Sequence, residues 1–550
     1  MTVIMPNEDE IFSRLDLAFA RFLSQRATFD ATRKKALETL LATLSQQQHQ
    51  GHNCIEISDV DKTLLLDSGL VSKNPGQSSQ IHPLIIEQNR LYLHRYWSYE
   101  DRMAKQIKLI AQHANTVESL DNLLDHYFGV NKTETNWQRE AAKIAAQHDF
   151  CIITGGPGTG KTTTICKILA VLQELTDEPL LTALAAPTGK AAMRLQEAIA
   201  INLVELACQD SIKENIPHTA NTLHRLLGAK PPSPYFRHDA KNPLVFDLVV
   251  VDEASMVDLA LMSKLVDALK LGAKLILLGD KDQLASVESG AVLADLIAAL
   301  PDNTVELKQS YRFDDGIKRL ADAVNQQHHK IAWDILSADG GATNILEQKQ
   351  LIPYVLSQRV EYVSLVEANA EFADIYRAFG RFQVLCSNRH GENGVLEINM
   401  AVEKALFRQH LKHSAASWYS GRPVMVLQNN PALHLYNGDI GFCLPDKEQN
   451  GNLMVFFQRP DGTAKKHLPA RLPTCETVFA MTIHKSQGSE FDEVLIVLPE
   501  TVNPVLSKEL LYTAITRAKK KINIVAEESV FSATINRKMG RVTGLANKFE

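Results

Sequence analysis

A glycine-rich run in the first half of the chain has the composition of a phosphate-binding loop. It reads Gly155-Gly156-Pro157-Gly158-Thr159-Gly160-Lys161-Thr162-Thr163 and fits the pattern G-x-x-x-x-G-K-S/T. An apolar run before it predicts a strand and the residues after it predict a helix, which is the context that this loop requires. Backbone N–H groups would face phosphates, Lys161 would neutralise the β- and γ-phosphate oxygens, and the Thr162 hydroxyl would bind Mg²⁺. The run predicts an ATP and Mg²⁺ site; the alternative is a glycine-rich turn without nucleotide.

Two adjacent carboxylates supply the partner that such a loop needs. Asp252 and Glu253 directly follow the apolar run 248–251, which predicts a buried strand. Asp252 would hold the Mg²⁺ shell, and Glu253 would act as general base on the attacking water. Gln283 follows the next predicted strand and is placed to contact the γ-phosphate and report its loss; the alternative for its segment is a polar loop.

These side chains need parallel strands that end at one edge of a sheet. From about residue 130, short β-branched or Leu-rich runs alternate with helical patterns, which is typical of buried parallel strands joined by helices. The order predicts two α/β domains in tandem. The expected strands are 150–154, 180–186, 248–251, 275–278, 305–307, 383–386, 494–498 and 522–525.

The remaining segments suggest three domains. Residues 1–125 predict a helical domain without a catalytic constellation, in which a helical face carries Leu15, Phe19 and Leu23. Residues 126–335 predict the first α/β domain, with a loop or small insertion at about 205–246. Residues 336–550 predict the second, with a small β insertion at about 415–475 that includes strands at 423–427 and 453–457.

Composition excludes several classes of protein. The 550 residues carry a net charge of −6, so any nucleic-acid contact must be a local groove, since proteins that coat duplex DNA are usually basic. No apolar run of about 18 residues predicts a membrane span, and the acidic N-terminus has the wrong charge for a secretory signal. Seven scattered cysteines form no C-x-x-C pair, which favours reduced thiols in the cytoplasm and no zinc or iron–sulfur site.

Further runs resemble the motifs of superfamily 1 helicases in order and composition. They are 186–192 (APTGKAA), 222–225 (TLHR), 307–312 (LKQSYR), 480–492 (AMTIHKSQGSEFD) and 512–519 (YTAITRAK), while 136–139 (NWQR) resembles the motif whose glutamine, Gln138 here, reads adenine. Thr188, Thr482 and Ser486 suit contacts to DNA phosphates without reading sequence. His224 and His484 could contact phosphate or stack on a base, or could be structural. The resemblance adds Gly488 and Glu490 as nucleotide contacts, and Lys190, Arg389 and Asn437 as DNA contacts.

A motor of this kind needs ATP between two domains, because hydrolysis must move one domain against the other. The second domain must then supply cations that stabilise the charge of the transferring phosphoryl group. Arg312 and Arg517 are the candidate arginine fingers. The alternative for each is a surface or salt-bridging arginine.

Nearly the whole chain resembles the RecD family, whose members are the alpha subunits of exodeoxyribonuclease V, the RecBCD complex. The resemblance rests on 243–258, 278–288, 386–389 (CSNR), 436–441 (YNGDIG), 51–54 (GHNC) and 91–96 (LYLHRY), and is weakest over 55–90 and 205–240. It implies two tandem RecA-like domains, an SH3-like β insertion in the second, and an N-terminal helical domain that contacts a partner. It also implies an ATP-dependent 5′→3′ helicase that acts on single-stranded DNA at duplex ends, in a heterotrimer with RecB-like and RecC-like subunits, for recombinational repair and degradation of linear DNA.

Other interpretations are weaker. Asp302 with Glu306 and Lys308 superficially matches a nuclease pattern, but the spacing is too short, so we expect cleavage by a partner subunit. His410 and His413 have no evident third ligand and predict a solvated helix face. A stand-alone RecD-like helicase would usually carry tandem helix-hairpin-helix elements, which 1–125 does not suggest. A non-catalytic scaffold with a decayed loop disagrees with the intact catalytic set.

Overall fold

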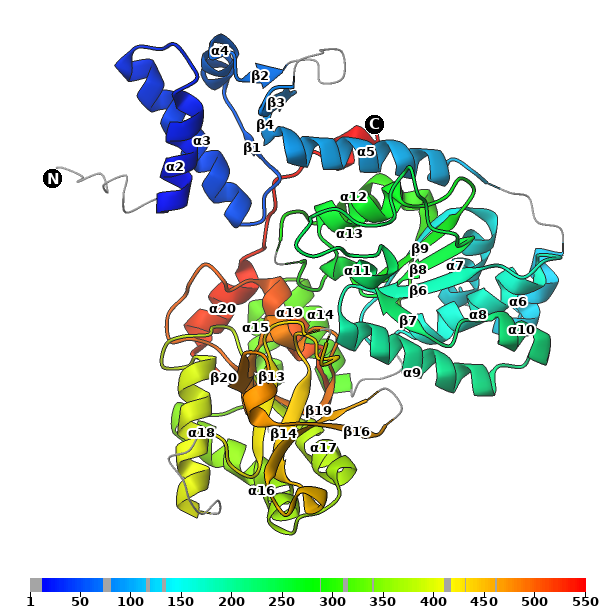
Figure 1. The fold of residues 1–550 in the computed structure, drawn as a ribbon, viewed down its shortest axis with the longest axis vertical. Coiled ribbons are helices and arrows are strands. Elements are labelled where there is room, and N and C mark those ends of the chain that lie inside the picture. Colours follow the sequence, from blue (N-terminus) through cyan, green and yellow to red (C-terminus); the bar gives the residue numbers. More distant parts are fainter. Residues whose placement is uncertain are drawn as a thin grey trace.

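The structure is a computed structural model, and its description covers ten segments of the chain. These are residues 12–72, 81–114, 119–130, 135–286, 288–309, 315–338, 341–409, 417–430, 432–459 and 462–550. Three bodies follow one another along the chain (Figure 1). We call them the N-terminal unit (12–93), domain 1 (94–309) and domain 2 (315–536), and we call 537–550 the tail. Three residues named above, Arg312, His410 and His413, lie outside the described segments.

The N-terminal unit combines helices with a small sheet. Its helices were expected, but its four-stranded sheet, in the order β1-β4-β3-β2, was not predicted. The strands have two to four residues each, too few for an alternating apolar pattern to stand out. Leu84 and Leu91 of the sheet are fully buried in one core with Leu37, Leu41 and Leu65 of the helices. The elements are α2 (Arg14–Ser24), α3 (Ala31–His49), β1 (Cys54–Glu56), α4 (Asp59–Asp67), β2 (Val71–Ser72), β3 (Leu84–Glu87) and β4 (Arg90–Leu93).

Domain 1 is a parallel sheet in the order β10-β5-β9-β8-β6-β7, covered by helices on both faces. Alternate residues of the central strand β5 belong to different cores, because Cys151 and Ile153 pack on one face and Phe150 and Ile152 on the other. The strands are β5 (Phe150–Thr154), β6 (Thr182–Ala186), β7 (Ala220–Thr222), β8 (Leu248–Val251), β9 (Lys274–Gly279) and β10 (Thr304–Glu306). The helices are α7 (Trp137–Gln147), α8 (Lys161–Glu174), α9 (Gly189–Glu205), α10 (Asp210–Asn215), α11 (Leu223–Leu226), α12 (Leu259–Asp267) and α13 (Val292–Ala299).

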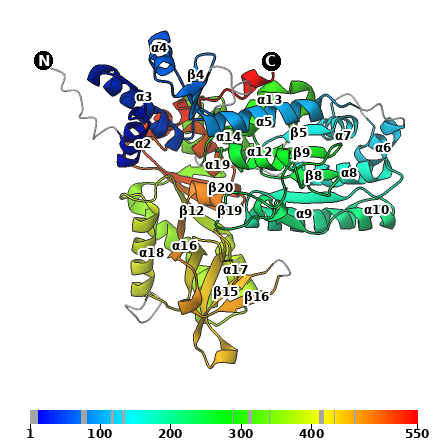
Figure 2. The ribbon, with the colours of Figure 1, turned by 45° about the horizontal axis from the view of Figure 1, so that its top comes forward.

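Two helices that begin before residue 126 also pack on domain 1. These are α5 (His94–Ala111) and α6 (Leu120–Phe128). Met103 and Ile107 of α5 are fully buried in the core that contains Phe150, and Leu124 of α6 is buried in the opposite core. In both views α5 lies across α12 (Figure 1 and Figure 2). Among the described residues up to 125, the part before α5 therefore has a core of its own, whereas α5 and α6 share the cores of domain 1.

Domain 2 contains a second parallel sheet, in the order β11-β20-β19-β12-β18. Its strands are β11 (Thr343–Ile345), β12 (Phe382–Cys386), β18 (Ala480–Thr482), β19 (Phe491–Val497) and β20 (Ala518–Val525). Its helices are α14 (Asp315–Asn325), α15 (His329–Ser337), α16 (Leu351–Glu367), α17 (Phe372–Gly380), α18 (Val395–Gln409), α19 (Lys508–Ile515) and α20 (Glu528–Asn536). Leu320 of α14 and Leu336 of α15 are buried in the core of this sheet, so both helices pack with domain 2 although they begin before residue 336.

The two α/β sheets confirm the predicted fold class, and two inserted segments add detail. Residues 415–475 hold most of a five-stranded antiparallel sheet, in the order β16-β15-β14-β13-β17; an SH3-like topology for it stays a prediction. Its strands are β13 (Arg422–Val426), β14 (Ile440–Pro445), β15 (Leu453–Gln458), β16 (Ala464–His467) and β17 (Cys475–Thr477). Within 205–246, β7 pairs with β6, so part of that segment completes the first sheet.

The tail leaves domain 2 and returns to the other two bodies. In Figure 1 it runs in red from α20 toward α5. Arg541 donates to the carbonyl oxygens of Glu288 (2.8 Å) and Gly290 (2.7 Å) and also to that of Ser286. A Cβ built on Gly51 would lie 3.0 Å from the Arg541 guanidinium carbon. The Arg541 side chain therefore packs directly against the backbone of Gly51, where a larger residue would be in the way. Arg541 therefore joins domain 1 to the N-terminal unit.

The next residues of the tail extend that junction. Asn53 N donates to Val542 O at 3.0 Å, and Val542 N donates to His52 Nδ1 at 2.9 Å. Burial raises the pKa of Glu100 to about 7, although its carboxyl accepts from Asn53 Nδ2 at 2.8 Å. Lys548 pairs with Glu87 at 2.6 Å. Among the described residues, no helix combines the length and apolarity that a membrane crossing needs.

Arg541→Ala should loosen the junction without unfolding the domains. It removes three charge-assisted hydrogen bonds to one loop, and we expect local opening to become easier by about 2 kcal/mol, roughly thirty-fold in the opening equilibrium. The measurement is amide hydrogen exchange at Gly290, which donates to Gly51 O, and at Asn53. The matched control is Arg537→Ala, because Arg537 donates to a single exposed carbonyl, that of Asn503. Equal exchange in both variants would contradict the role of Arg541.

Candidate functional site

The glycine-rich loop lies between β5 and α8. Gly158 and Gly160 have φ of +77° and +81°, which favour glycine, and a Cβ on Gly155 would lie 2.8 Å from Thr159 Oγ1. Lys161 Nζ donates to the carbonyl oxygens of Gly155 (2.6 Å) and Gly156 (3.1 Å). The loop therefore wraps around its own ammonium group, and Pro157, Thr162 and Thr163 complete the loop and the first turn of α8.

Asp252 and Glu253 lie at the carboxyl end of β8. Burial and the neighbouring Glu253 raise the pKa of Asp252 to about 6, whereas the charge of Lys161 lowers it. Glu253 adopts φ of +52°, and its backbone N–H donates to Asp252 Oδ1 at 2.8 Å. The strand order β5-β9-β8 thus brings the predicted ammonium and carboxylate into electrostatic contact.

The third predicted group, Gln283, lies in the loop after β9. We call Asp280 to Leu284 the sensor loop. Gln283 Nε2 donates to Asp280 Oδ2 at 3.0 Å, and both side chains are almost fully buried. Burial raises the pKa of Asp280, and Lys161 opposes this. Lys161 therefore acts electrostatically on acidic groups of two different loops.

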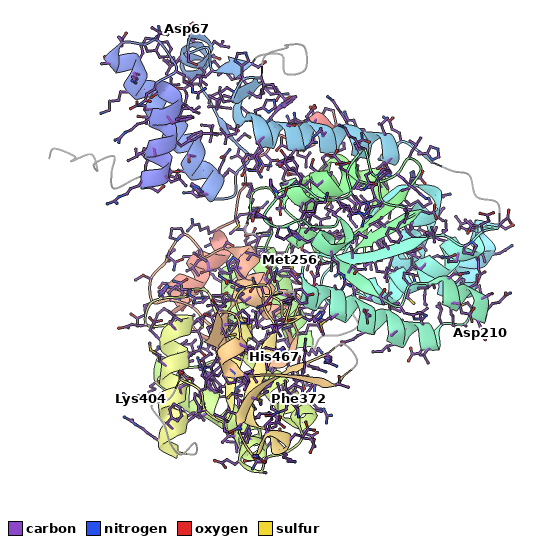
Figure 3. All side chains as sticks on the ribbon, in the orientation of Figure 1. Asp67, Asp210, Met256, Phe372, Lys404 and His467 are labelled. Carbon is purple, nitrogen blue, oxygen red and sulfur yellow. The ribbon has the colours of Figure 1, made fainter. Side chains whose placement is uncertain are left out.

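Side chains of domain 2 form hydrogen bonds with the sensor loop. Leu284 N donates to Thr513 Oγ1 at 2.8 Å, and Gln487 Nε2 donates to Leu284 O at 2.9 Å. Tyr512 OH donates to Asp280 Oδ2 at 3.2 Å. Side chains occupy the space between the ribbons of the two domains (Figure 3). These contacts were not predicted from the sequence, although Tyr512 and Thr513 belong to the same helicase-like run as Arg517.

Arg517 is buried at the domain boundary with 2% of its surface exposed. It donates to the backbone carbonyls of Thr513 (3.1 Å) and Ser489 (3.2 Å) in its own domain. Burial lowers its pKa, while the charges of Glu253 in domain 1 and Glu490 in domain 2 raise it. One candidate finger is thus buried at the domain boundary under the electrostatic influence of the general-base candidate, and the roles of Arg517 and Arg312 as fingers stay predictions.

The remaining candidate nucleotide contacts surround the same boundary. Gln138 Nε2 lies 3.5 Å from Thr159 O and close to Gly160. Glu490 forms an ion pair with Arg194 of domain 1 at 2.8 Å, and Gly488 O accepts from the same guanidinium at 2.9 Å. Gly488 and Glu490 therefore also contribute to the contact between the domains.

Several candidate DNA contacts line the junction between domain 1 and the β insertion. Thr188 caps α9 by accepting from Ala191 N, and a Cβ on Gly189 would lie 3.6 Å from Tyr436 Cβ of the insertion. Burial and Arg194 lower the pKa of the adjacent Lys190 to about 8. Asn437 is exposed and accepts from Lys485 Nζ at 2.6 Å. Thr482 caps the short helix η6 (Ile483–Ser486).

The other candidate DNA contacts differ in their surroundings. Ser486 is fully buried and donates to Ile483 O at 2.7 Å, so its hydroxyl cannot reach a phosphate in this conformation; the residue type could not reveal this orientation. Burial and Arg541 lower the pKa of His484. His224 is exposed beside the Phe236 ring, and Arg389 pairs with Glu476 at 2.7 Å.

Two further patterns concern metals and nucleases. Glu306 lies in β10 and pairs with Lys281 at 2.9 Å, which supports a structural role for the segment 302–308. In the described part of the chain, no group of three or more His, Cys, Asp and Glu side chains is arranged to hold a metal by itself.

Comparison with known proteins gives three matching family models. They are the AAA domain at residues 138–289, the UvrD-like helicase C-terminal domain at 477–525, and the N-terminal domain of the RecBCD enzyme subunit RecD at 8–75. A solved structure of Pif1 helicase from Bacteroides in complex with ADP-AlF3 and ssDNA is 20% identical, with a TM-score of 0.40, over 72% of this chain and 93% of that one.

Two curated relatives match over most of the chain. The ATP-dependent RecD2 DNA helicase of Deinococcus radiodurans is 30% identical over 84% of this chain and 59% of its own length. The RecBCD enzyme subunit RecD of Haemophilus influenzae is 35% identical over 86% of this chain and 82% of its own length. The chain therefore belongs to the RecD family.

Proposed function

We propose that the chain is an ATP-dependent DNA helicase that moves 5′→3′ along single-stranded DNA as a subunit of a RecBCD-type complex. One observation carries the proposal: the loop that holds Asp280 and Gln283 in domain 1 is hydrogen-bonded to Tyr512 and Thr513 of domain 2, at 3.2 and 2.8 Å, in the helicase-like run that also contains the buried Arg517. Such a site changes its chemistry when the domains move, and it thereby links hydrolysis to movement.

The chemistry follows from the positions of the groups. Lys161 would leave the loop carbonyls to bind β- and γ-phosphate oxygens, and Glu253 would accept a proton from the attacking water. Arg517 would balance the negative charge that develops on the transferring group. Thr162 and Asp252 offer the oxygen ligands that Mg²⁺ prefers, and Mg²⁺ would supply further neutralisation of the phosphates.

The proposed DNA path runs over the junction where domain 1 meets the β insertion and η6. Thr188, Asn437 and Thr482 offer small polar groups suited to a phosphate backbone. With a net charge of −6, the chain cannot attract DNA by its overall charge, so a local path of this kind is needed. The direction of movement rests on the family resemblance alone.

We infer that the chain assembles with RecB-like and RecC-like subunits. The match of residues 8–75 to the N-terminal domain of RecD favours this over a stand-alone helicase. The complex would process DNA ends in the cytoplasm, where the chromosome lies, and cleavage would belong to a partner. The N-terminal unit is our candidate docking surface, because Leu15 and Phe22 lie seven positions apart on α2 and are 63% and 57% exposed.

Lys161→Gln should abolish hydrolysis while the fold is kept. The change removes a positive charge at the phosphates but no packing, and we expect DNA-stimulated ATPase activity to fall about a hundred-fold or more. The control is Lys349→Gln, since the Lys349 side chain is 79% exposed and pairs with the exposed Glu347, away from the phosphate-binding loop in the sequence. ATPase activity of the purified Lys161→Gln chain close to that of the control would refute the assignment of the loop.

Leu15→Glu combined with Phe22→Glu should weaken assembly but not hydrolysis. Deleting all residues before 131 would be a poorer test, because α5 and α6 are part of the domain 1 core. We expect co-purification with the two partner subunits to fall at least ten-fold, while DNA-stimulated ATPase activity of the chain alone stays unchanged. Leu271→Glu, at a fully exposed position of domain 1, is the control. Wild-type assembly of the double variant would exclude this face of α2 as the docking surface.

A further inference from the structure

Tyr512 of domain 2 reaches across the domain boundary into the nucleotide site. Its hydroxyl donates to Asp280 Oδ2 at 3.2 Å, and a Cβ built on Gly156 would lie 3.1 Å from the same hydroxyl oxygen. Only 6% of the Tyr512 surface is exposed. One hydroxyl group of domain 2 thus lies against both the phosphate-binding loop and the sensor loop of domain 1.

Asp280 is the point at which this hydroxyl meets Gln283. The oxygen Oδ2 accepts from Tyr512 and from Gln283 Nε2, and Oδ1 accepts from Asp282 N at 3.0 Å. Gln283 is therefore turned toward Asp280, and it must leave that carboxylate to reach a γ-phosphate. Because Asp280 is only 2% exposed, bulk water does not readily replace the lost donor, and a buried carboxylate short of donors is costly.

We propose that Tyr512 is a positioning residue for ATP hydrolysis, which keeps Asp280 hydrogen-bonded when Gln283 turns toward the γ-phosphate. This inference rests on the proposed function. Tyr512 lies on α19, and the neighbouring Thr513 accepts from the sensor loop. Arg517 lies two residues beyond the end of α19, so the hydroxyl and the arginine both depend on the docking of domain 2. When the two domains are closed on each other, Gln283 can therefore leave Asp280 and turn toward the γ-phosphate. The same closed arrangement places Arg517 at the domain boundary.

The first measurement is the steady-state ATPase of the purified full-length chain at saturating single-stranded DNA. Tyr512→Phe keeps the ring and removes the hydroxyl, and we expect kcat to fall about ten-fold, which corresponds to about 1.4 kcal/mol. We expect KM for ATP to change less than two-fold, because the effect lies in the hydrolytic arrangement and not in ATP binding. Tyr419→Phe is the matched control: Tyr419 is also buried and donates to a carboxylate, that of Glu403 at 2.5 Å, but within domain 2.

The second measurement separates a positioning role from a structural one. Tyr512 acts through Asp280 on Gln283, so Tyr512→Phe should add no further loss of kcat to a Gln283→Ala chain. A full additional ten-fold loss would overturn the proposal, because it would place Tyr512 on an independent route. Wild-type kcat in Tyr512→Phe, or a loss equal to that in Tyr419→Phe, would overturn it as well and leave the helicase assignment standing. A wild-type chain without DNA-stimulated ATPase would refute both.

Discussion

The positive charge of Arg517 is buried where the two RecA-like domains meet, and the arrangement of the site depends on it. Its hydrogen bonds go to backbone carbonyls of domain 2, and no carboxylate accepts from it among the hydrogen bonds of the described residues. An enclosed guanidinium needs compensating negative charge nearby, which Glu253 and Glu490 supply. The charge is therefore tolerated because the domains are closed on each other, and a nucleotide phosphate would add to the same compensation.

Parallel sheets explain how distant residues reach this boundary. In domain 1 the phosphate-binding loop, the Asp252 pair and the sensor loop each follow a strand, and β5, β9 and β8 are neighbours. Their carboxyl ends share one edge, which is where open α/β sheets bind ligands. Domain 2 contributes from η6 and α19, which follow and flank its own strands. The tail adds a second connection, since Arg541 binds the segment just after the sensor loop.

The sequence was most informative where the chain is buried on two sides. The strands 150–154 and 248–251 were predicted with their observed bounds, because both consist of apolar runs with turn residues at their ends. Lys161, Asp252 and Gln283 were predicted to converge because each follows such a strand. The strands of the N-terminal unit were missed because runs of two to four residues carry no periodic signal.

Contacts made through the backbone or across domains could not be predicted. Arg541 binds carbonyl oxygens, which every residue type provides, and therefore no sequence pattern marks its partners. A tyrosine on a helix gives no indication that its hydroxyl reaches another domain, as that of Tyr512 does. Ser486 shows the converse, since a hydroxyl suited to DNA is turned into the core by local hydrogen bonding.

The central claim is that hydrolysis requires a cation from domain 2 in a site built on domain 1. The most direct measurement is the DNA-stimulated kcat of Arg517→Lys, together with the affinity of the variant for ATP. Lysine keeps the charge but lacks the planar fork that arginine presents, so we predict a loss of kcat of about 10³-fold with a much smaller change in ATP affinity. A variant that kept its kcat and lost only affinity would contradict the account, because domain 1 alone would then suffice for the chemistry.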